Sequence, residues 1–217
     1  MGLTVKGIDR DHRVMRLSTL DSLWSLWAEH GRAMTDEQWE RPTRLGSWEV
    51  RSLYAHAGSW PAAFPALLGQ VRDAPPTHAT AAELLREFNG PQGVAHRLRD
   101  WAAANARQDA AKYTTGQLVE QFAVVGPAAI ATARELGPVT IDYFGQAILP
   151  LGEAVSIGIM EATVHLLDLR RALGQEVDLP AAALAHTAAL LAEMAPPVAF
   201  IEVATGRGAD GVFPVLS

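Results

Sequence analysis

The segment from Glu161 to Asp168 places ionisable side chains within a long apolar run. Glu161, His165 and Asp168 are separated by four and then three residues, so a helix carries all three on one face. Their neighbours are apolar and indicate that this face is turned toward a core: Ile157, Met160, Val164 and Leu167. Because ionisable groups are costly to bury unless they are paired, the segment needs a partner. A divalent metal is the simplest partner, provided that another helix supplies a third ligand.

The second expected helix carries a candidate for that third ligand. His56 follows Leu53 by three residues and precedes Trp60 by four, so it shares the apolar side of its helix. Helix bundles build metal sites from side chains on facing helices. Two alternatives stay open at this point: His56 as a core histidine bonded to a backbone carbonyl, and Glu161 with His165 as a buried ion pair.

The composition excludes several classes of protein. The 217 residues are 49% hydrophobic, enough for one substantial core, and the net charge of -6 argues against a nucleic-acid partner. There is no cysteine, which excludes disulfides, a protein thiol nucleophile and a cysteine zinc site. Any thiol chemistry would therefore need a small-molecule thiol. Residues 1–13 are polar and no run approaches the length of a membrane span, so we expect a cytoplasmic protein without a membrane partner.

Apolar residues recur at helical spacing along most of the chain. We expect Ser47 to cap the second helix and Gly174 to end the helix of the ionisable segment. Pro61 should kink or end the second helix, and Pro127 should kink the fifth. Residues 139–149 are extended in character and form either a strand or an ordered loop. The expected helices cover residues 9–34, 48–67, 81–88, 93–113, 115–136, 151–173 and 181–194.

These elements predict a mostly all-α fold. We expect a four-helix bundle with extra helices over residues 1–197, followed by a short C-terminal tail, 198–217, that could hold one short strand. Residues 206–211 match the G-x-G-x-x-G pattern of dinucleotide sites. Such a site needs a helix after it and a βαβ unit around it, and only six residues follow. The match is therefore accidental.

Two motifs resemble one known family. Residues 45–56 resemble the Gly-x-Trp-x-Val-Arg-x-Leu-x-Ala-His opening of the second helix in the mycothiol-dependent maleylpyruvate isomerase family, which belongs to the DinB-like superfamily of metal-binding four-helix bundles. Residues 160–168 resemble its second motif, Glu-x-x-x-His-x-x-Asp. The family holds its metal with a histidine on the second helix and a glutamate and histidine on the later one. The resemblance therefore implies His56, Glu161 and His165 as metal ligands.

Two histidines and a carboxylate with open positions fit catalytic zinc, which is the expected metal, with iron and nickel as alternatives. Asp168 would accept a hydrogen bond that orients a ligand histidine. Its alternative is a helix cap or a surface salt bridge with Arg170 or Arg171. Trp48 opens the helix that carries His56, and we expect it to wall the cofactor pocket or to belong to the core.

The resemblance implies an enzyme that activates a thiol. A coordinating metal deprotonates a thiol outright, and mycothiol would then act on a small electrophilic substrate by isomerisation or S-transfer. Alternatives are a tailoring enzyme of a biosynthetic pathway that uses the metal or pocket without a thiol, a hydrolase that uses metal-bound water, and a non-catalytic metal-binding bundle. Besides the substrate and the thiol, a second copy of the chain in a homodimer is an expected kind of partner.

The sequence departs from the family pattern in two places. Family members often have an arginine three residues before the ligand glutamate, and here that position is Gly158. An arginine would suit a substrate carboxylate, so the resemblance does not extend to that contact. The sequence also stops at Ser217, where two-domain members continue into a smaller domain. We expect that domain to be absent or reduced to the tail.

Overall fold

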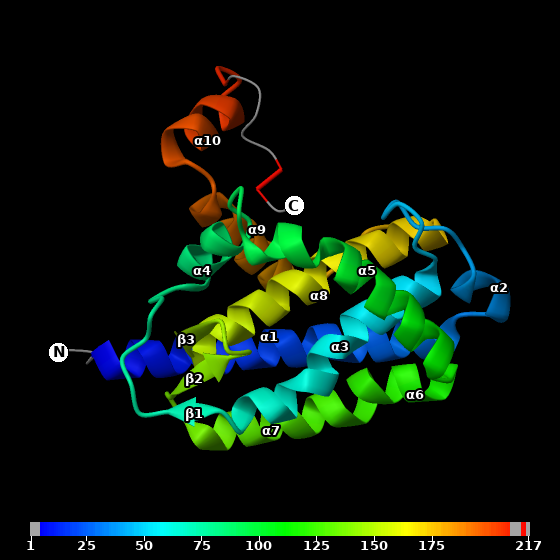
Figure 1. The fold of residues 1–217 in the computed structure, drawn as a ribbon, viewed down its shortest axis with the longest axis horizontal. Coiled ribbons are helices and arrows are strands. Elements are labelled where there is room, and N and C mark those ends of the chain that lie inside the picture. Colours follow the sequence, from blue (N-terminus) through cyan, green and yellow to red (C-terminus); the bar gives the residue numbers. More distant parts are fainter. Residues whose placement is uncertain (1–4, 209–213, 216–217) are drawn as a thin grey trace.

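The computed structural model describes residues 5–208 and 214–215 of the chain. Helices dominate the described residues, and a small sheet joins them (Figure 1). The α-helices are α1 (Val5–Ala33), α2 (Asp36–Trp39), α3 (Val50–Leu68), α4 (Ala81–Phe88), α5 (Val94–Lys112), α6 (Thr115–Glu120), α7 (Gly126–Leu136), α8 (Leu151–Leu173), α9 (Ala181–Met194) and α10 (Pro197–Ala204). A π-helix, η1 (Gln121–Val125), joins α6 to α7. The prediction of a mostly all-α fold is confirmed.

Four long helical segments form the bundle. They are α1, α3, α8 and the run from α6 through η1 to α7, and both α1 and α3 contact α7 and α8 (Figure 1). α5 packs on α3, and α9 packs on α8 and α1. The largest fully buried side chains fill the space between these helices: Leu20, Trp24, Trp27, Tyr54, Phe64, Phe122 and Ile130. The structure therefore has the expected bundle with extra helices around it.

Aromatic side chains fix the positions of α1, α3 and α8 relative to one another. The Trp27 ring stacks on Phe122 with centroids 5.2 Å apart, and Tyr54 meets both rings edge-on. The Tyr54 hydroxyl donates to the Trp27 carbonyl at 2.8 Å, and the Trp27 indole N–H donates to the Ala162 carbonyl at 3.2 Å. Buried hydrogen bonds and aromatic pairs of this kind each contribute about 1 kcal/mol. Because Ala162 follows Glu161, these contacts hold the ionisable segment of α8 against the core.

The fourth bundle segment changes from an α-helix to a short π-helix just before Pro127. Sequence periodicity predicted one helix with a kink, and the structure inserts the π-helix η1 immediately before α7. Proline cannot donate a backbone hydrogen bond and its ring clashes with the carbonyl four residues earlier, so a wider turn accommodates it. The Thr114 side chain caps the segment by accepting from the Gln117 backbone N–H at 3.2 Å.

The start of α3 differs from the sequence prediction. Glu49, rather than Ser47, is the N-cap residue, and the helix begins at Val50. Residues 41–49 form a tight loop in which Pro42 and Glu49 are paired antiparallel. This pairing keeps the backbone extended up to the first turn of the helix. Pro61 also does not end the helix, which continues to Leu68.

The stretch from 139 to 149 is a β-hairpin. Strands β2 (Thr140–Tyr143) and β3 (Ala147–Pro150) pair antiparallel, and β1 (Val71–Arg72) adds to β2 to give the order β1-β2-β3. In this register Ile141 faces Leu149. Strand β3 runs directly into α8, so the hairpin has a fixed position beside the first turns of that helix (Figure 1).

The described part of the tail contains a helix where the sequence allowed a short strand. α10 begins at Pro197, and proline at the first turn favours a helix because its backbone angle is already set. α10 packs only lightly on α9 and none of its residues is buried. Among the described helices, none has the length and apolar character that a membrane span requires.

Gly126 gives a test of the packing between α1 and α7. A Cβ atom at this position would lie 2.6 Å from the buried Trp24 ring. We expect Gly126→Ala to destabilise the fold by about 1–3 kcal/mol through overpacking and to lower the Tm by about 2–12 °C, as followed by circular dichroism. Gly116→Ala in α6 is the control, because its Cβ would meet nothing closer than 3.9 Å. An unchanged Tm for Gly126→Ala would contradict this packing.

Candidate metal centre

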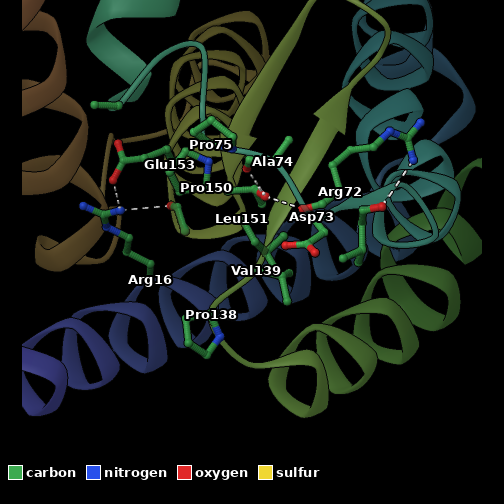
Figure 2. Close-up of a pocket in the computed structure, with 14 residues that line it drawn as sticks. Arg16, Arg72, Asp73, Ala74, Pro75, Pro138, Val139, Pro150, Leu151 and Glu153 are labelled. Carbon is green, nitrogen blue, oxygen red and sulfur yellow. Dashed lines mark hydrogen bonds and ion pairs between the residues drawn. The ribbon is translucent and has the colours of Figure 1, made fainter.

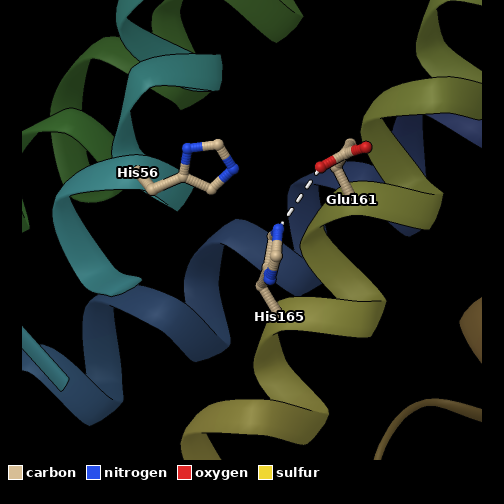
Figure 3. A group of neighbouring side chains, drawn as sticks. All are labelled: His56, Glu161 and His165. Atoms are coloured by element: carbon tan, nitrogen blue, oxygen red, sulfur yellow. Dashed lines mark ion pairs between the residues drawn. The ribbon is translucent and has the colours of Figure 1, made fainter. Parts of the chain in front are cut away.

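Three side chains from two facing helices converge at one place. His56 comes from α3, and Glu161 and His165 come from α8 (Figure 3). One ligand atom from each lies within 4.8 Å of the other two. His165 Nε2 is 3.5 Å from Glu161 Oε2, and the two imidazole rings are 5.0 Å apart and nearly perpendicular. The structure thus brings together the three residues that the sequence singled out as ligands.

The triad fits a zinc ion in its donors and its spacing. Ligand atoms about 2.0–2.2 Å from a tetrahedral zinc ion are about 3.3 Å apart, close to the 3.5 Å between His165 and Glu161. The third ligand atom, from His56, lies within 4.8 Å of the other two. The side chains of Glu161 and His165 are 29% and 15% exposed, so solvent reaches the site. Two imidazoles and one carboxylate would supply three of the four ligands that zinc usually takes, so one position would remain for another ligand.

Asp168 sets the tautomer of His165. Its Oδ2 lies 3.2 Å from His165 Nδ1, so Nδ1 is the atom that carries a proton toward the carboxylate and Nε2 faces Glu161. Asp168 is itself buried, and its other oxygen accepts a hydrogen bond from Arg44 Nε at 2.6 Å. The alternative of a surface salt bridge with Arg170 or Arg171 is therefore wrong, since the partner comes from another part of the chain.

A single loop contacts the His56 imidazole directly and supports the His165 imidazole through Asp168. Residues 41–49 carry Arg44, which holds His165 through Asp168, and Trp48, whose ring is 4.9 Å from the His56 ring. Arg41 in the same loop donates to the Leu173 carbonyl at the end of α8. Trp48 is partly buried and lies directly beside a candidate ligand. The loop thus connects α3 to α8 around the site.

The pKa values of the two histidines are shifted in opposite directions. Burial, together with the charge of the nearby His165 and against that of Glu161, lowers the pKa of His56 to about 4, so His56 is neutral at pH 7. Burial would also lower the pKa of His165, but hydrogen bonds and charges of Asp168 and Glu161 outweigh it and raise the pKa to about 9. For Glu161, burial opposes ionisation, yet the hydrogen bond and charge of His165 lower its pKa. Without metal, the site holds a protonated His165 between two carboxylates.

A large cavity lies elsewhere in the molecule. It has a volume of about 820 Å³ and is bordered by β1, β2 and the start of α8, with none of the triad among its lining residues (Figure 2). Its charged side chains include two ion pairs, Arg16 with Glu153 and Arg72 with the neighbouring Asp142. Glu153 also accepts from the Ala81 backbone N–H at 2.9 Å. These contacts connect α1, α4 and α8.

The fold and the triad define a class of protein: a helical bundle that gathers two histidines and a glutamate, a possible metal-binding set, between two facing helices. Residues 20–170 match the family model described as the mycothiol maleylpyruvate isomerase N-terminal domain. The chain therefore belongs to this family, and the matched range includes His56, Glu161 and His165. No curated protein and no solved structure matches the chain at a significant level.

Sequence reasoning missed Arg44. It lies in an irregular loop, where no periodicity marks a side chain as facing a site, and its partner Asp168 is 124 residues away. Trp60, which the spacing places on the apolar side of its helix, packs against the core but is partly exposed. The sequence also did not predict that Tyr143 and Phe144 lie near Trp60, because it indicated only an extended segment there and not its position relative to the helices.

Zinc affinity should depend on pH. Binding must displace the proton from His165, whose pKa is about 9, while His56 is already neutral above its pKa of about 4. We therefore expect the apparent affinity to rise about tenfold per pH unit between pH 6 and 8, as measured by competition with a chelator. Asp168→Asn should flatten this dependence by lowering the pKa of His165. An affinity independent of pH in the wild-type chain would contradict the assignment.

Arg44 should influence metal binding through Asp168. Arg44→Gln removes the charge that faces the buried carboxylate, and we expect zinc affinity to fall about tenfold, the usual effect of losing a group that supports a ligand. Arg41→Gln is the matched control, since Arg41 tethers the same loop to α8 without touching Asp168. Equal losses in both variants would show that the loop acts only as a tether.

Proposed function

We propose that the chain is a metal-dependent enzyme that uses a low-molecular-weight thiol, of the mycothiol type, for isomerisation or S-transfer on a small electrophile. The observation that supports this most directly is the triad of His56, Glu161 and His165, which leaves one side open to solvent. Membership of the mycothiol maleylpyruvate isomerase N-terminal domain family supports the thiol. The absence of cysteine agrees with a thiol that comes from a small molecule.

In this proposal His56, Glu161 and His165 hold the ion, for which zinc fits best. When bound, a divalent ion supplies the positive charge that lowers the pKa of a coordinating thiol. Glu161 is the single anionic ligand of the set, so a net positive charge remains to attract a thiolate. His56 enters as a neutral imidazole because burial keeps its pKa at about 4. Asp168 keeps the proton of His165 on Nδ1 and so leaves Nε2 free to coordinate.

The thiolate would then act on carbon. In an isomerisation its sulfur adds to one carbon of a cis double bond, the resulting single bond rotates, and loss of the thiolate restores the double bond as trans. In an S-transfer the adduct is released. The residues of this chain have the same tasks in both reactions: they bind the ion, orient its imidazole ligands and leave one side of it open.

We also propose a division of the chain into a bundle domain and an appendage. We infer that residues 1–197 form the bundle domain and residues 198–217 an appendage to it. The light contact between α10 and α9, with no buried residue in α10, supports this division.

His165→Ala tests the ligand set. We expect this variant to lose stoichiometric zinc, measured by elemental analysis after dialysis, while the helical content seen by circular dichroism stays close to that of the wild type. His30→Ala is the control, because His30 is a partly buried histidine of α1 outside the triad. Full zinc occupancy in His165→Ala would show that other residues hold the ion.

Activity assays separate the proposed chemistry from its alternatives. The zinc-loaded chain should turn over an electrophilic substrate only when mycothiol is added. Turnover without thiol would point instead to metal-bound water or to a biosynthetic step that needs no thiol. A purified chain that takes up no metal would favour a non-catalytic bundle.

A further inference from the structure

Aromatic side chains border the triad on the side of the β-hairpin. The Trp60 ring centroid lies 6.3 Å from that of Tyr143 and 6.4 Å from that of Phe144, and the two hairpin rings are 4.8 Å apart. Trp60 belongs to α3, and the other two belong to β2 and the hairpin tip. We refer to Trp60, Tyr143 and Phe144 as the aromatic cluster. Tyr143 is buried, whereas Trp60 and Phe144 are partly exposed and offer apolar surface.

The aromatic cluster adjoins the candidate ligands. Trp60 follows His56 by one helical turn on α3. Its ring also covers α8 one turn before Glu161, because a Cβ atom on Gly158 would lie 3.4 Å from Trp60 Cζ3. Burial raises the pKa of Tyr143, and the charge of Glu161 raises it further, which agrees with their proximity. The cluster therefore contacts both helices that carry the candidate ligands, close to the triad.

Phe144 is held in an unusual exposed position. The residue is 51% exposed, and it has a φ of 55°, in the left-handed region that large side chains avoid. Its N–H donates to the Asp142 carbonyl at 3.1 Å, and the Asp142 side chain accepts from the Gly145 N–H at 2.7 Å. These contacts maintain a conformation that leaves half of an aromatic ring in water. Core packing does not explain such a ring, whereas contact with a bound ligand would.

Three arginines on the segments that carry or support the triad already donate hydrogen bonds. Arg44 binds Asp168, and Arg170 donates to the Glu176 carbonyl. Arg51 donates to the Ala110 and Tyr113 carbonyls. A substrate carboxylate would therefore have to compete with existing hydrogen bonds for these guanidinium groups. The surface beside the triad instead offers aromatic faces and edges, which favour a neutral, unsaturated ring.

From these observations we infer that the electrophile is a neutral aromatic molecule whose ring packs on Trp60 and Phe144 while its reactive carbon faces the triad. This inference rests on the proposed thiol chemistry and specifies its second substrate. An enone conjugated to a ring is the simplest member of the class. The thiolate sulfur bonds to its β-carbon, the electrons of the double bond move to the α-carbon, and that carbon takes a proton from water.

Binding without thiol tests the substrate class separately from the reaction. The probes are 4-phenylbut-3-en-2-one, a neutral aromatic enone, and fumarate, an unsaturated dianion, each titrated into the zinc-loaded chain by calorimetry or ligand-observed NMR. We expect the enone to bind at least tenfold more tightly than fumarate. Phe144→Ala and Phe144→Leu should both weaken enone binding by about 2- to 12-fold, the usual range for an aromatic pair, with zinc occupancy unchanged. Since the Phe144 ring is exposed, neither variant threatens the core.

Trp101→Ala is the matched control, since Trp101 is a 62% exposed aromatic residue of α5 outside the aromatic cluster. It should leave enone binding unchanged. Tighter binding of fumarate, or enone binding that is the same in wild type and Phe144→Ala, would overturn the inference. Enone binding that depends on Phe144 without any reaction with added mycothiol would support the aromatic surface and contradict the thiol chemistry, so the two failures are distinguishable.

Discussion

Three ionisable side chains on one face of α8 can enter the core only because each has a partner. Glu161 pairs with His165, His165 with Asp168, and Asp168 with Arg44 from a distant loop. Asp168 is the most buried member, so removal of its partners would leave a buried charge uncompensated, which is more costly than the loss of a surface ion pair. The position of α8 between α1 and α3, and hence the geometry of the site, depends on this chain of contacts.

Helices and irregular segments contribute differently to the site. The helices hold the candidate ligands, and the hydrogen bond from the Trp27 indole to the Ala162 carbonyl keeps α8 in place against the core. The loop from 41 to 49 and the β-hairpin surround the ligands with an arginine and with aromatic rings. Changes in these two segments could therefore alter the pKa values of the ligands and the choice of substrate while the ligand set stays the same.

Strong local signals explain which parts of the fold the sequence predicts. Helix boundaries at 81–88, 151–173 and 181–194 follow from periodicity with caps and prolines, and the structure confirms them. Gly174 takes the left-handed conformation at the end of α8, as its position indicated. The start of α3 was missed because the pairing of Pro42 with Glu49 is not visible as periodicity. Candidate ligands could be named from spacing and resemblance, but their convergence, and the role of Arg44, depend on tertiary packing.

The central claim is that His56, Glu161 and His165 bind one ion together. X-ray absorption spectroscopy of the zinc-loaded chain tests it most directly, with His56→Ala as the comparison. We expect a first coordination sphere of nitrogen and oxygen atoms at about 2.0–2.1 Å with scattering from two imidazoles, and from one imidazole in the variant. A spectrum with oxygen ligands only, or one that His56→Ala leaves unchanged, would contradict the account.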